Sequence, residues 1–182
     1  MLVSSLLGLL ALCSTTVHAI GQASCVAFQN AASTFPVVSN RKATPILLSP
    51  DEWPGVQRAA QDFADDIQRV AGVRPVLSNV TLSATPTTVN STSGGNGTSP
   101  DIRGPSASQA IIIGTLGKSD LIAQVVKNAK LDVSGVQGQW EAFMAKEVQN
   151  PLPGVKSAYV IIGADKRGSI FAMYDHSEQF GE

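Results

Sequence analysis

The stretch QAIIIGTLGKSDLI at residues 109–122 decides the fold class of this chain. The apolar run AIII at 110–113 predicts a strand that is buried on both faces, because no polar residue interrupts it. Ser119 and Asp120 follow a short turn and predict the start of a helix. A strand that leads directly into a helix is the unit from which α/β domains are built. The apolar residues expected to face inward from that helix are Leu121, Ile122, Val125 and Val126.

The residues before this stretch predict a second strand–helix unit. ILL at 46–48 predicts a short buried strand. SPDE at 49–52 predicts the start of the next helix, because Ser caps, Pro suits the first helical position and acids favour the positive end of the helix dipole. Gly72 ends that helix, and 73–77 predicts a strand that Pro75 confines to a sheet edge. The apolar face of the helix consists of Val56, Ala60, Phe63, Ile67 and Val70.

The residues after the deciding stretch predict two more strands and a last helix. Residues 141–149 alternate like a half-buried strand, and 158–162 form a core strand after the turn PLPG at 151–154. DKRG at 165–168 is a polar loop before a helix over about 169–179. The predicted fold class is an α/β (α+β) sandwich, in which helices pack on a mixed sheet of about five strands.

Length and composition exclude several classes of protein. The 182 residues support one domain, or one and a part, and 43% of them are hydrophobic. The chain has 13 Lys and Arg against 14 Asp and Glu, and therefore a net charge of −1. Proteins that bind nucleic acids or anionic membranes usually carry an excess of positive charge, which this chain does not have. Aromatic residues make up 5% of the chain, and most of them fall at positions expected to face the core. We therefore expect neither nucleic acid nor membrane as a partner.

Residues 1–19 have the pattern of a secretory signal peptide. Their apolar run at 6–12 is too short to span a bilayer, and the segment ends in VHA at 17–19. We therefore expect a secreted, extracellular product. Its mature chain keeps Cys25 alone, because cleavage also removes Cys13. Three interpretations of this odd cysteine stay open: a partner further along a longer chain, a bond between two copies, or a buried inert thiol.

Residues 78–108 differ from the rest of the chain in amino-acid composition. Ser, Thr, Asn, Gly and Pro dominate them, so they bury too little apolar surface to order well, and we interpret them as an insertion in a loop. The insertion contains three N-glycosylation sequons, at Asn79, Asn90 and Asn96. Behind a signal peptide, these sequons predict a glycoprotein.

Three patterns that suggest chemistry have simpler interpretations. GTLGKS at 114–119 has two residues between its glycines, whereas a phosphate loop has four, so we interpret it as a strand-to-helix turn with a Ser cap. His176 is interpreted as a solvated or capping residue, because adjacent residues point about 100° apart on a helix and cannot converge with it. Asp62, Asp65 and Asp66 are interpreted as a solvated helix face. We expect neither a metal nor a cofactor.

Four longer segments carry a family resemblance: SPDEWPGVQRAAQDFADDIQRVAGVRP at 49–75, IIIGTLGKSDLI at 111–122, KLDVSGVQGQWEAF at 130–143 and NPLPGVKSAYVIIGADKRGSIFAMYDHSEQFG at 150–181. Taken together, they resemble the amino-terminal domain of glycoside hydrolase family 115, the xylan α-1,2-glucuronidases, in the form typical of filamentous fungi. The resemblance covers nearly all of the mature chain except the sequon-rich insertion.

The resemblance implies a leader at 20–43 and the family domain at 44–182, with the α/β sandwich that precedes the barrel in hexosaminidases, known there as domain 2. It implies that the full-length enzyme is an inverting glycoside hydrolase of carbohydrate metabolism and xylan degradation. That enzyme releases glucuronic acid, or its 4-O-methyl ether, from glucuronoxylan. Its carboxylates lie on a following barrel, so we expect this chain to be a fragment, truncated before the barrel, without catalytic residues and inactive alone. The resemblance also allows a dimer of the full-length enzyme.

One loop of the resembling domain is a candidate for contact with substrate. Asp165, Lys166 and Arg167 match the family's element at the end of a core strand, and Lys or Arg would suit a glucuronate carboxylate. The other interpretation of these residues is an interdomain salt-bridge loop. A second hypothesis for the whole chain is a short secreted carbohydrate-binding or cell-wall-associated module without enzymatic activity.

Overall fold

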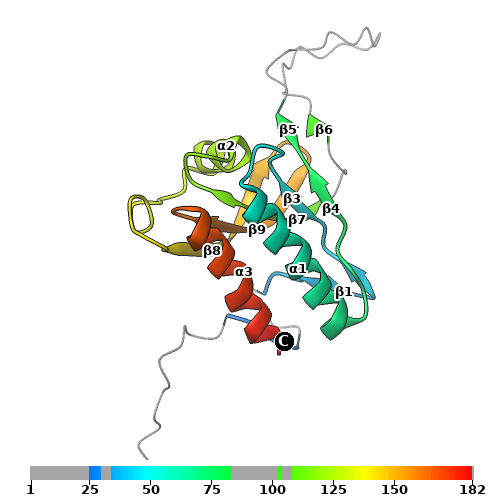
Figure 1. The fold of residues 1–182 in the computed structure, drawn as a ribbon. Coiled ribbons are helices and arrows are strands. Elements are labelled where there is room, and N and C mark those ends of the chain that lie inside the picture. Colours follow the sequence, from blue (N-terminus) through cyan, green and yellow to red (C-terminus); the bar gives the residue numbers. More distant parts are fainter. Residues whose placement is uncertain (1–24, 30–33, 83–101, 104–107, 182) are drawn as a thin grey trace, which may run out of the picture.

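The computed structural model describes residues 25–29, 34–82, 102–103 and 108–181. Its centre is a five-stranded sheet with the strand order β4-β3-β7-β9-β8 (Figure 1). All neighbouring strands are parallel except β8 and β9, which are antiparallel. The predicted α/β class with a mixed sheet of about five strands is therefore confirmed. The strands are β3 (Ile46–Leu48), β4 (Leu77–Asn79), β7 (Gln109–Thr115), β8 (Phe143–Leu152) and β9 (Val155–Gly163).

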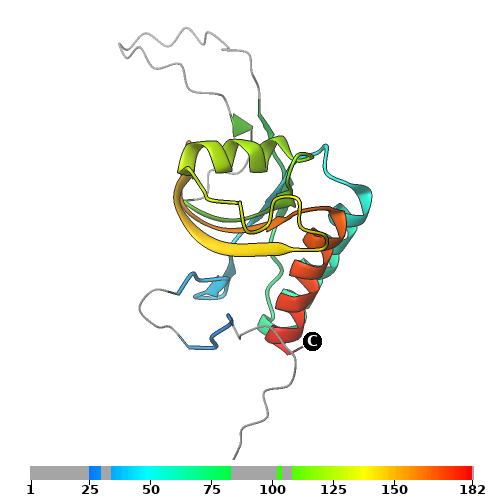
Figure 2. The ribbon, with the colours of Figure 1, turned by 90° about the vertical axis from the view of Figure 1, so that its left-hand side faces the viewer.

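Helices cover both faces of this sheet. α1 and α3 lie side by side on one face, and α2 lies on the other (Figure 2). In β7, Ile111 and Ile113 pack with α1 and α3, whereas Ala110 and Ile112 pack with α2, so this strand is buried on both faces as predicted. Within the described ranges, no helix combines the length and apolar character needed to cross a membrane. The helices are α1 (Pro54–Ala71), α2 (Asp120–Ala129) and α3 (Lys166–Phe180).

Two helices begin at other residues than predicted. α1 begins at Pro54, which takes the first helical position, and not in the segment 49–52. That segment forms a turn instead, in which the Glu52 N–H donates to the Ser49 carbonyl oxygen at 3.2 Å. α3 begins at Lys166, so most of the predicted polar loop is the first turn of a helix. The predicted end of α1 at Gly72 is correct, because this residue has a left-handed φ of 74°.

The strand bounds also move by a few residues. β4 starts at Leu77 and not at Val73, although it is an edge strand as predicted. β8 continues beyond the predicted end at Gln149. Its pairing with β9 shifts register between Gln149 and Leu152, where Asn150 has a positive φ of 51° and Pro151 has no N–H to donate.

Two short strand pairs lie outside the main sheet and were not predicted. β1 (Val38–Ser39) and β2 (Lys42–Ala43) form a hairpin within the expected leader. β5 (Thr81–Leu82) pairs antiparallel with β6 (Ile102–Arg103), which brings two parts of the expected insertion side by side. Strands of two residues have no periodicity to detect. The expected signal peptide, Asn90 and Asn96 lie outside the described residues.

Candidate functional site

The carboxyl ends of β3, β7 and β9 meet at one edge of the sheet, which we call the carboxyl edge. From β3 the chain continues into α1 on one face, and from β7 into α2 on the opposite face. In open α/β sheets, ligands bind in the crevice at such a change of direction. The carboxyl edge is therefore the first place to look for a binding site.

A carboxylate of the chain itself fills this crevice. Glu52 is buried, and its Oε2 accepts a hydrogen bond from the Thr115 N–H at 2.8 Å. Its Oε1 accepts from the Thr115 hydroxyl and from the Trp53 N–H, each at 2.9 Å. The Thr115 and Trp53 donors that could hold an anionic ligand are thus already bonded to a side chain of the protein itself. This agrees with the rejection of a phosphate loop at 114–119, where Ser119 caps α2 by accepting from the Ile122 N–H.

A second hydroxyl extends this network to α3. Ser169 is fully buried, and its Oγ lies 2.8 Å from the Thr115 Oγ1 and 3.3 Å from the Gly114 carbonyl oxygen. Gly163, the last residue of β9, lies so close that a Cβ there would collide with the backbone of Ser169. The network therefore ties the ends of β7 and β9 to the start of both helices on that face.

The predicted site residue Asp165 is the N-cap of α3. Its Oδ1 accepts from the N–H groups of Gly168 and Arg167 at 2.8 and 2.9 Å, and its Oδ2 accepts from the Glu141 N–H at 3.1 Å. The Gly168 and Glu141 bonds lower the pKa of this carboxyl below its ordinary value of 3.8, with smaller contributions from Arg167. Asp165 thus uses its carboxylate to hold the backbone of two segments together.

The predicted site residues Lys166 and Arg167 lie on the surface at the first turn of α3. The Arg167 Nε lies 2.9 Å from the Glu141 Oε1, and the guanidinium stands over the rings of Trp140 and Phe171 at 5.7 and 5.5 Å from their centroids. Arg167 and Asp165 are therefore close in space, both around Glu141. The Arg167 side chain keeps half of its surface exposed.

Several aromatic side chains near the carboxyl edge face solvent, contrary to the expectation that most aromatics face the core. Trp140 is 79% exposed and Trp53 is 44% exposed. The Lys118 Nζ lies 5.1 Å from the centroid of the Trp53 ring, a cation–π contact. Phe171 is also partly exposed. Both Trp residues lie in loops, just before a helix or a strand. This position was the signal in the sequence that could have predicted their exposure.

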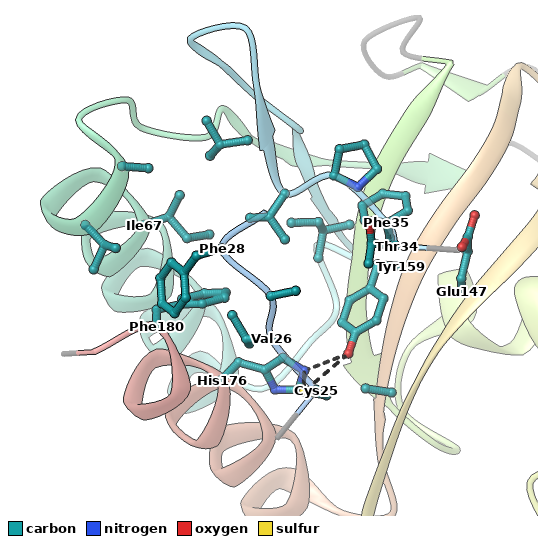
Figure 3. A pocket seen from close by; sticks show the side chains of 18 of the residues that line it. Cys25, Val26, Phe28, Thr34, Phe35, Ile67, Glu147, Tyr159, His176 and Phe180 are labelled. Carbon is teal, nitrogen blue, oxygen red and sulfur yellow. Dashed lines mark hydrogen bonds between the residues drawn. The ribbon is translucent and has the colours of Figure 1, made fainter. Parts of the chain in front are cut away.

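A pocket of about 620 Å³ lies away from the carboxyl edge, under the amino-terminal segments 25–29 and 34–38 (Figure 3). Its walls come from β8, β9 and the last turns of α1 and α3. Most of the lining is apolar, and Phe63 stacks on Phe180 with 5.7 Å between ring centroids. Pockets of this size accept small molecules in many proteins.

One wall of the pocket is polar. His176 is 3% exposed, so its interpretation as a solvated or capping residue was wrong. It lies on the same face of α3 as the buried Ala172 and Met173, and its Nε2 faces the Tyr159 hydroxyl at 2.9 Å. Cys25 lies beside them as an exposed free thiol, not as a buried one. Burial raises the pKa of the Tyr159 hydroxyl, and the nearby Cys25 raises it further.

The remaining predicted residues are a glycosylation asparagine and three aspartates of α1. Asn79 is exposed at the end of β4, where a glycan would meet solvent. The three aspartates of α1 each contact an arginine: Asp62 with Arg58, Asp65 with Arg74 and Asp66 with Arg69. Asp66 is buried, so its interpretation as part of a solvated helix face was wrong, and the other two are half-buried. In the described part of the chain, no three His, Cys, Asp or Glu side chains gather where they could hold a metal ion.

No protein-family model matches this chain, and no curated protein matches it. Among solved structures, it is similar to a family GH115 4-O-methyl-alpha-glucuronidase with specificity for decorated arabinogalactans. The two share 19% sequence identity with a TM-score of 0.50, over 76% of this chain. This chain spans 14% of the length of that protein's chain. At this level of identity, the similarity shows a shared α/β fold.

Proposed function

We propose that this chain is the non-catalytic amino-terminal part of a secreted α-glucuronidase of glycoside hydrolase family 115. The full-length enzyme would remove glucuronic acid, or its 4-O-methyl ether, from polysaccharide side chains by an inverting mechanism. Its 182-residue amino-terminal part would be inactive alone. The observation that carries the proposal is the shared fold with a family GH115 4-O-methyl-alpha-glucuronidase, of which this chain spans 14%.

The chemistry of the carboxyl edge supports a non-catalytic role for this domain. Glu52 and Asp165 lie there, and both accept hydrogen bonds from backbone N–H groups. Carboxylates that accept several backbone N–H bonds hold the backbone in place, and this supports a structural role for both residues. The catalytic pair would therefore come from a part of the enzyme outside this chain, as the family resemblance implies.

Lys166 and Arg167 would contribute to substrate binding in the complete enzyme. Both are exposed on the first turn of α3, and Arg167 lies over the exposed Trp140 ring. A guanidinium beside an aromatic face offers a carboxylate partner and a flat surface for a sugar ring. In the full-length enzyme, Arg167→Ala should raise KM for glucuronate-bearing substrates. Unchanged kinetics with lowered stability would show that Arg167 holds domains together instead.

The decisive experiment for the proposed function is the mass of the secreted, deglycosylated product, followed by an activity assay. We expect a species far heavier than the 19.0 kDa of this chain, and release of glucuronic acid or its methyl ether. Glucuronoxylan is the substrate that the family resemblance implies, and decorated arabinogalactan is the one named for the structural neighbour, so both are assayed. A secreted product that ends at Glu182 and is homogeneous and cooperatively folded would contradict the proposal.

One observation favours the second hypothesis, a short carbohydrate-binding module. Trp140 and Trp53 are exposed near the carboxyl edge, and exposed Trp rings stack on sugars. The test is retention of the 182-residue chain on insoluble xylan. Trp140→Ala should abolish retention, whereas the control Val76→Ser, at another exposed apolar residue, should leave it unchanged. Absence of retention for the unaltered chain would reject this hypothesis.

A further inference from the structure

Three side chains from distant parts of the sequence converge at the polar wall of the pocket. Cys25 precedes β1, Tyr159 lies in β9 and His176 lies in α3. The Cys25 Sγ is 3.6 Å from the His176 Nε2 and 3.9 Å from the Tyr159 hydroxyl oxygen (Figure 3). These distances allow proton transfer between the thiol and the imidazole after a small adjustment.

The hydrogen bonds of His176 decide which of its nitrogens can act as a base. Its Nδ1 lies 2.6 Å from the Ala172 carbonyl oxygen. Because a carbonyl oxygen only accepts, we assign the ring proton of the neutral imidazole to Nδ1. The lone pair of Nε2 then faces the thiol and the Tyr159 hydroxyl. A base oriented in this way by a third group is the arrangement that activates thiol nucleophiles.

Both reacting groups are held in place. The rings of Phe63 and Tyr159 meet the imidazole edge-on, with centroid distances of 6.4 and 5.6 Å. The Cys25 N–H donates to the Gln179 Oε1 at 2.7 Å, and Gln179 in turn donates to Asp175 at 2.8 Å. The segment that carries the thiol is thus fastened to the same helix that carries the imidazole.

The space beside the thiol is apolar and large enough for a small organic group. Its volume is about 620 Å³. Its apolar lining includes Phe63, Ile67 and Phe180, and Phe35 lines it beside Tyr159. The thiol shares its wall with His176 and Tyr159, and Lys146 and Glu147 of β8 also line the pocket. Such a pocket suits a molecule with an apolar body and a reactive group at one end.

We propose that Cys25 is a nucleophilic thiol, activated by His176, that forms a mixed disulfide with a small disulfide compound whose apolar substituent occupies the pocket. His176 takes the proton of the Cys25 S–H, and the resulting thiolate attacks one sulfur of the disulfide. The new bond joins Cys25 to that sulfur, and the old S–S bond breaks. The departing thiolate takes the proton back from His176 and leaves as a thiol.

Both the His176 Nε2–H and the Tyr159 O–H can donate to the thiolate during this step. Tyr159 stays protonated because its pKa is raised in the folded protein. This proposal is independent of the proposed function, since it uses no residue of the carboxyl edge. Its failure would leave the glucuronidase proposal unaffected.

The test measures the rate at which the full chain reacts with 4,4′-dithiodipyridine, a neutral aromatic disulfide. All variants carry Cys13→Ser, so that Cys25 is the only thiol. We expect the folded protein to react about ten-fold faster than the same protein unfolded in urea. His176→Gln should bring the folded rate down to that of the unfolded chain, and Tyr159→Phe should lower it several-fold. A folded rate equal to or below the unfolded rate would overturn the proposal, whether or not the variants fold.

A second disulfide reagent tests whether the apolar substituent occupies the pocket. Hydroxyethyl disulfide carries small polar substituents, so it needs little of the pocket. Ala145→Leu would extend a side chain from β8 into the pocket and should slow the aromatic disulfide at least about five-fold more than hydroxyethyl disulfide. Equal slowing of both reagents, or slowing of neither, would show that the pocket does not hold the substituent.

Discussion

The carboxyl edge and the pocket differ in the hydrogen bonding and the exposure of their polar side chains. At the carboxyl edge, Glu52, Thr115 and Ser169 bond to one another or to backbone groups. In the pocket, about 620 Å³ stays open, and the thiol of Cys25 is exposed beside His176. In the first region Glu52, Thr115 and Ser169 stabilise the fold through their mutual hydrogen bonds, whereas the second region leaves a thiol accessible.

This difference shows which part of the α/β sheet leaves polar side chains accessible to a ligand. The crevice at the carboxyl edge is the usual ligand site of the fold class, but here an internal carboxylate occupies it. At that edge, Trp140 and Arg167 are the exposed side chains that a ligand could contact beside the crevice. The pocket under the amino-terminal segments becomes the more open of the two regions. Four sets of substitutions test this contrast.

The largest effect is expected from Glu52→Ala. It would leave the N–H groups of Thr115 and Trp53 without their acceptor. We expect the free energy of unfolding to fall by about 4 kcal/mol, because each buried unsatisfied donor costs about 1 to 3 kcal/mol. Urea denaturation measures the change. Glu52→Gln keeps one acceptor oxygen and should lose about half as much, whereas a loss below about 1 kcal/mol for Glu52→Ala would show that the network contributes little.

Gly163→Ala should have the next largest effect. Its Cβ would collide with the backbone nitrogen and side chain of Ser169, which cannot move without disturbing α3. We expect a loss of about 3 kcal/mol, the upper range for overpacking in a core. The matched control is Gly135→Ala, where a Cβ meets no atom within 4 Å. Equal midpoints in thermal unfolding for the two variants would refute the close approach at Gly163.

Asp165→Ala should lower the free energy of unfolding by about 1 kcal/mol at neutral pH, because α3 loses its N-cap. The folded pKa of Asp165 lies below its ordinary value of 3.8. Stability from such a group is fully present above the unfolded pKa and is lost as the pH falls through the folded pKa.

The difference between the unaltered chain and Asp165→Ala should therefore shrink in acid, which urea titrations at several pH values would measure. Asp165→Asn is the control, because Asn also caps helices but does not titrate in this range. Its stability relative to Asp165→Ala should stay constant across the same pH range. A difference between Asp165 and Ala that grows in acid would contradict the assignment of the hydrogen bonds.

The smallest effect on stability is expected in the pocket. Ala145→Leu adds a side chain where space is open, so the free energy of unfolding should change by less than about 1 kcal/mol. Ala172→Leu is the control at a fully buried position of α3, where the same addition should cost about 2 kcal/mol. Calorimetry of both variants compares the two sites. Similar losses at both positions would mean that the pocket is filled.

Local sequence patterns correctly predicted the central strand of the sheet and the helix that follows it. The apolar run at 110–113 and the Ser119 cap are local signals, and both are confirmed. The start of α1 was misplaced because Pro50 and Pro54 both follow the rule for a first helical position. The choice between them depends on Glu52, whose side chain bonds to Thr115 far along the chain. A contact between residues so distant in sequence leaves no local signal.

The pocket was missed for a related reason. His176 was compared with its neighbours in sequence, whereas its structural neighbours on α3 are Ala172 and Met173, four and three residues earlier. Helical spacing could have indicated a buried histidine. Nothing in the sequence around Cys25 indicates that it would lie against α3, because the segment has no periodicity.

The two edges of the sheet have a consequence for self-association. One edge strand, β4, is three residues long. The other, β8, is interrupted by a register shift at Pro151 and carries the exposed charges of Lys146 and Glu147. A very short edge strand, exposed charges and an irregular register are devices that disfavour pairing with the sheet of another molecule. These features work against edge-to-edge pairing of a sheet whose inner strands β7 and β9 are rich in β-branched residues.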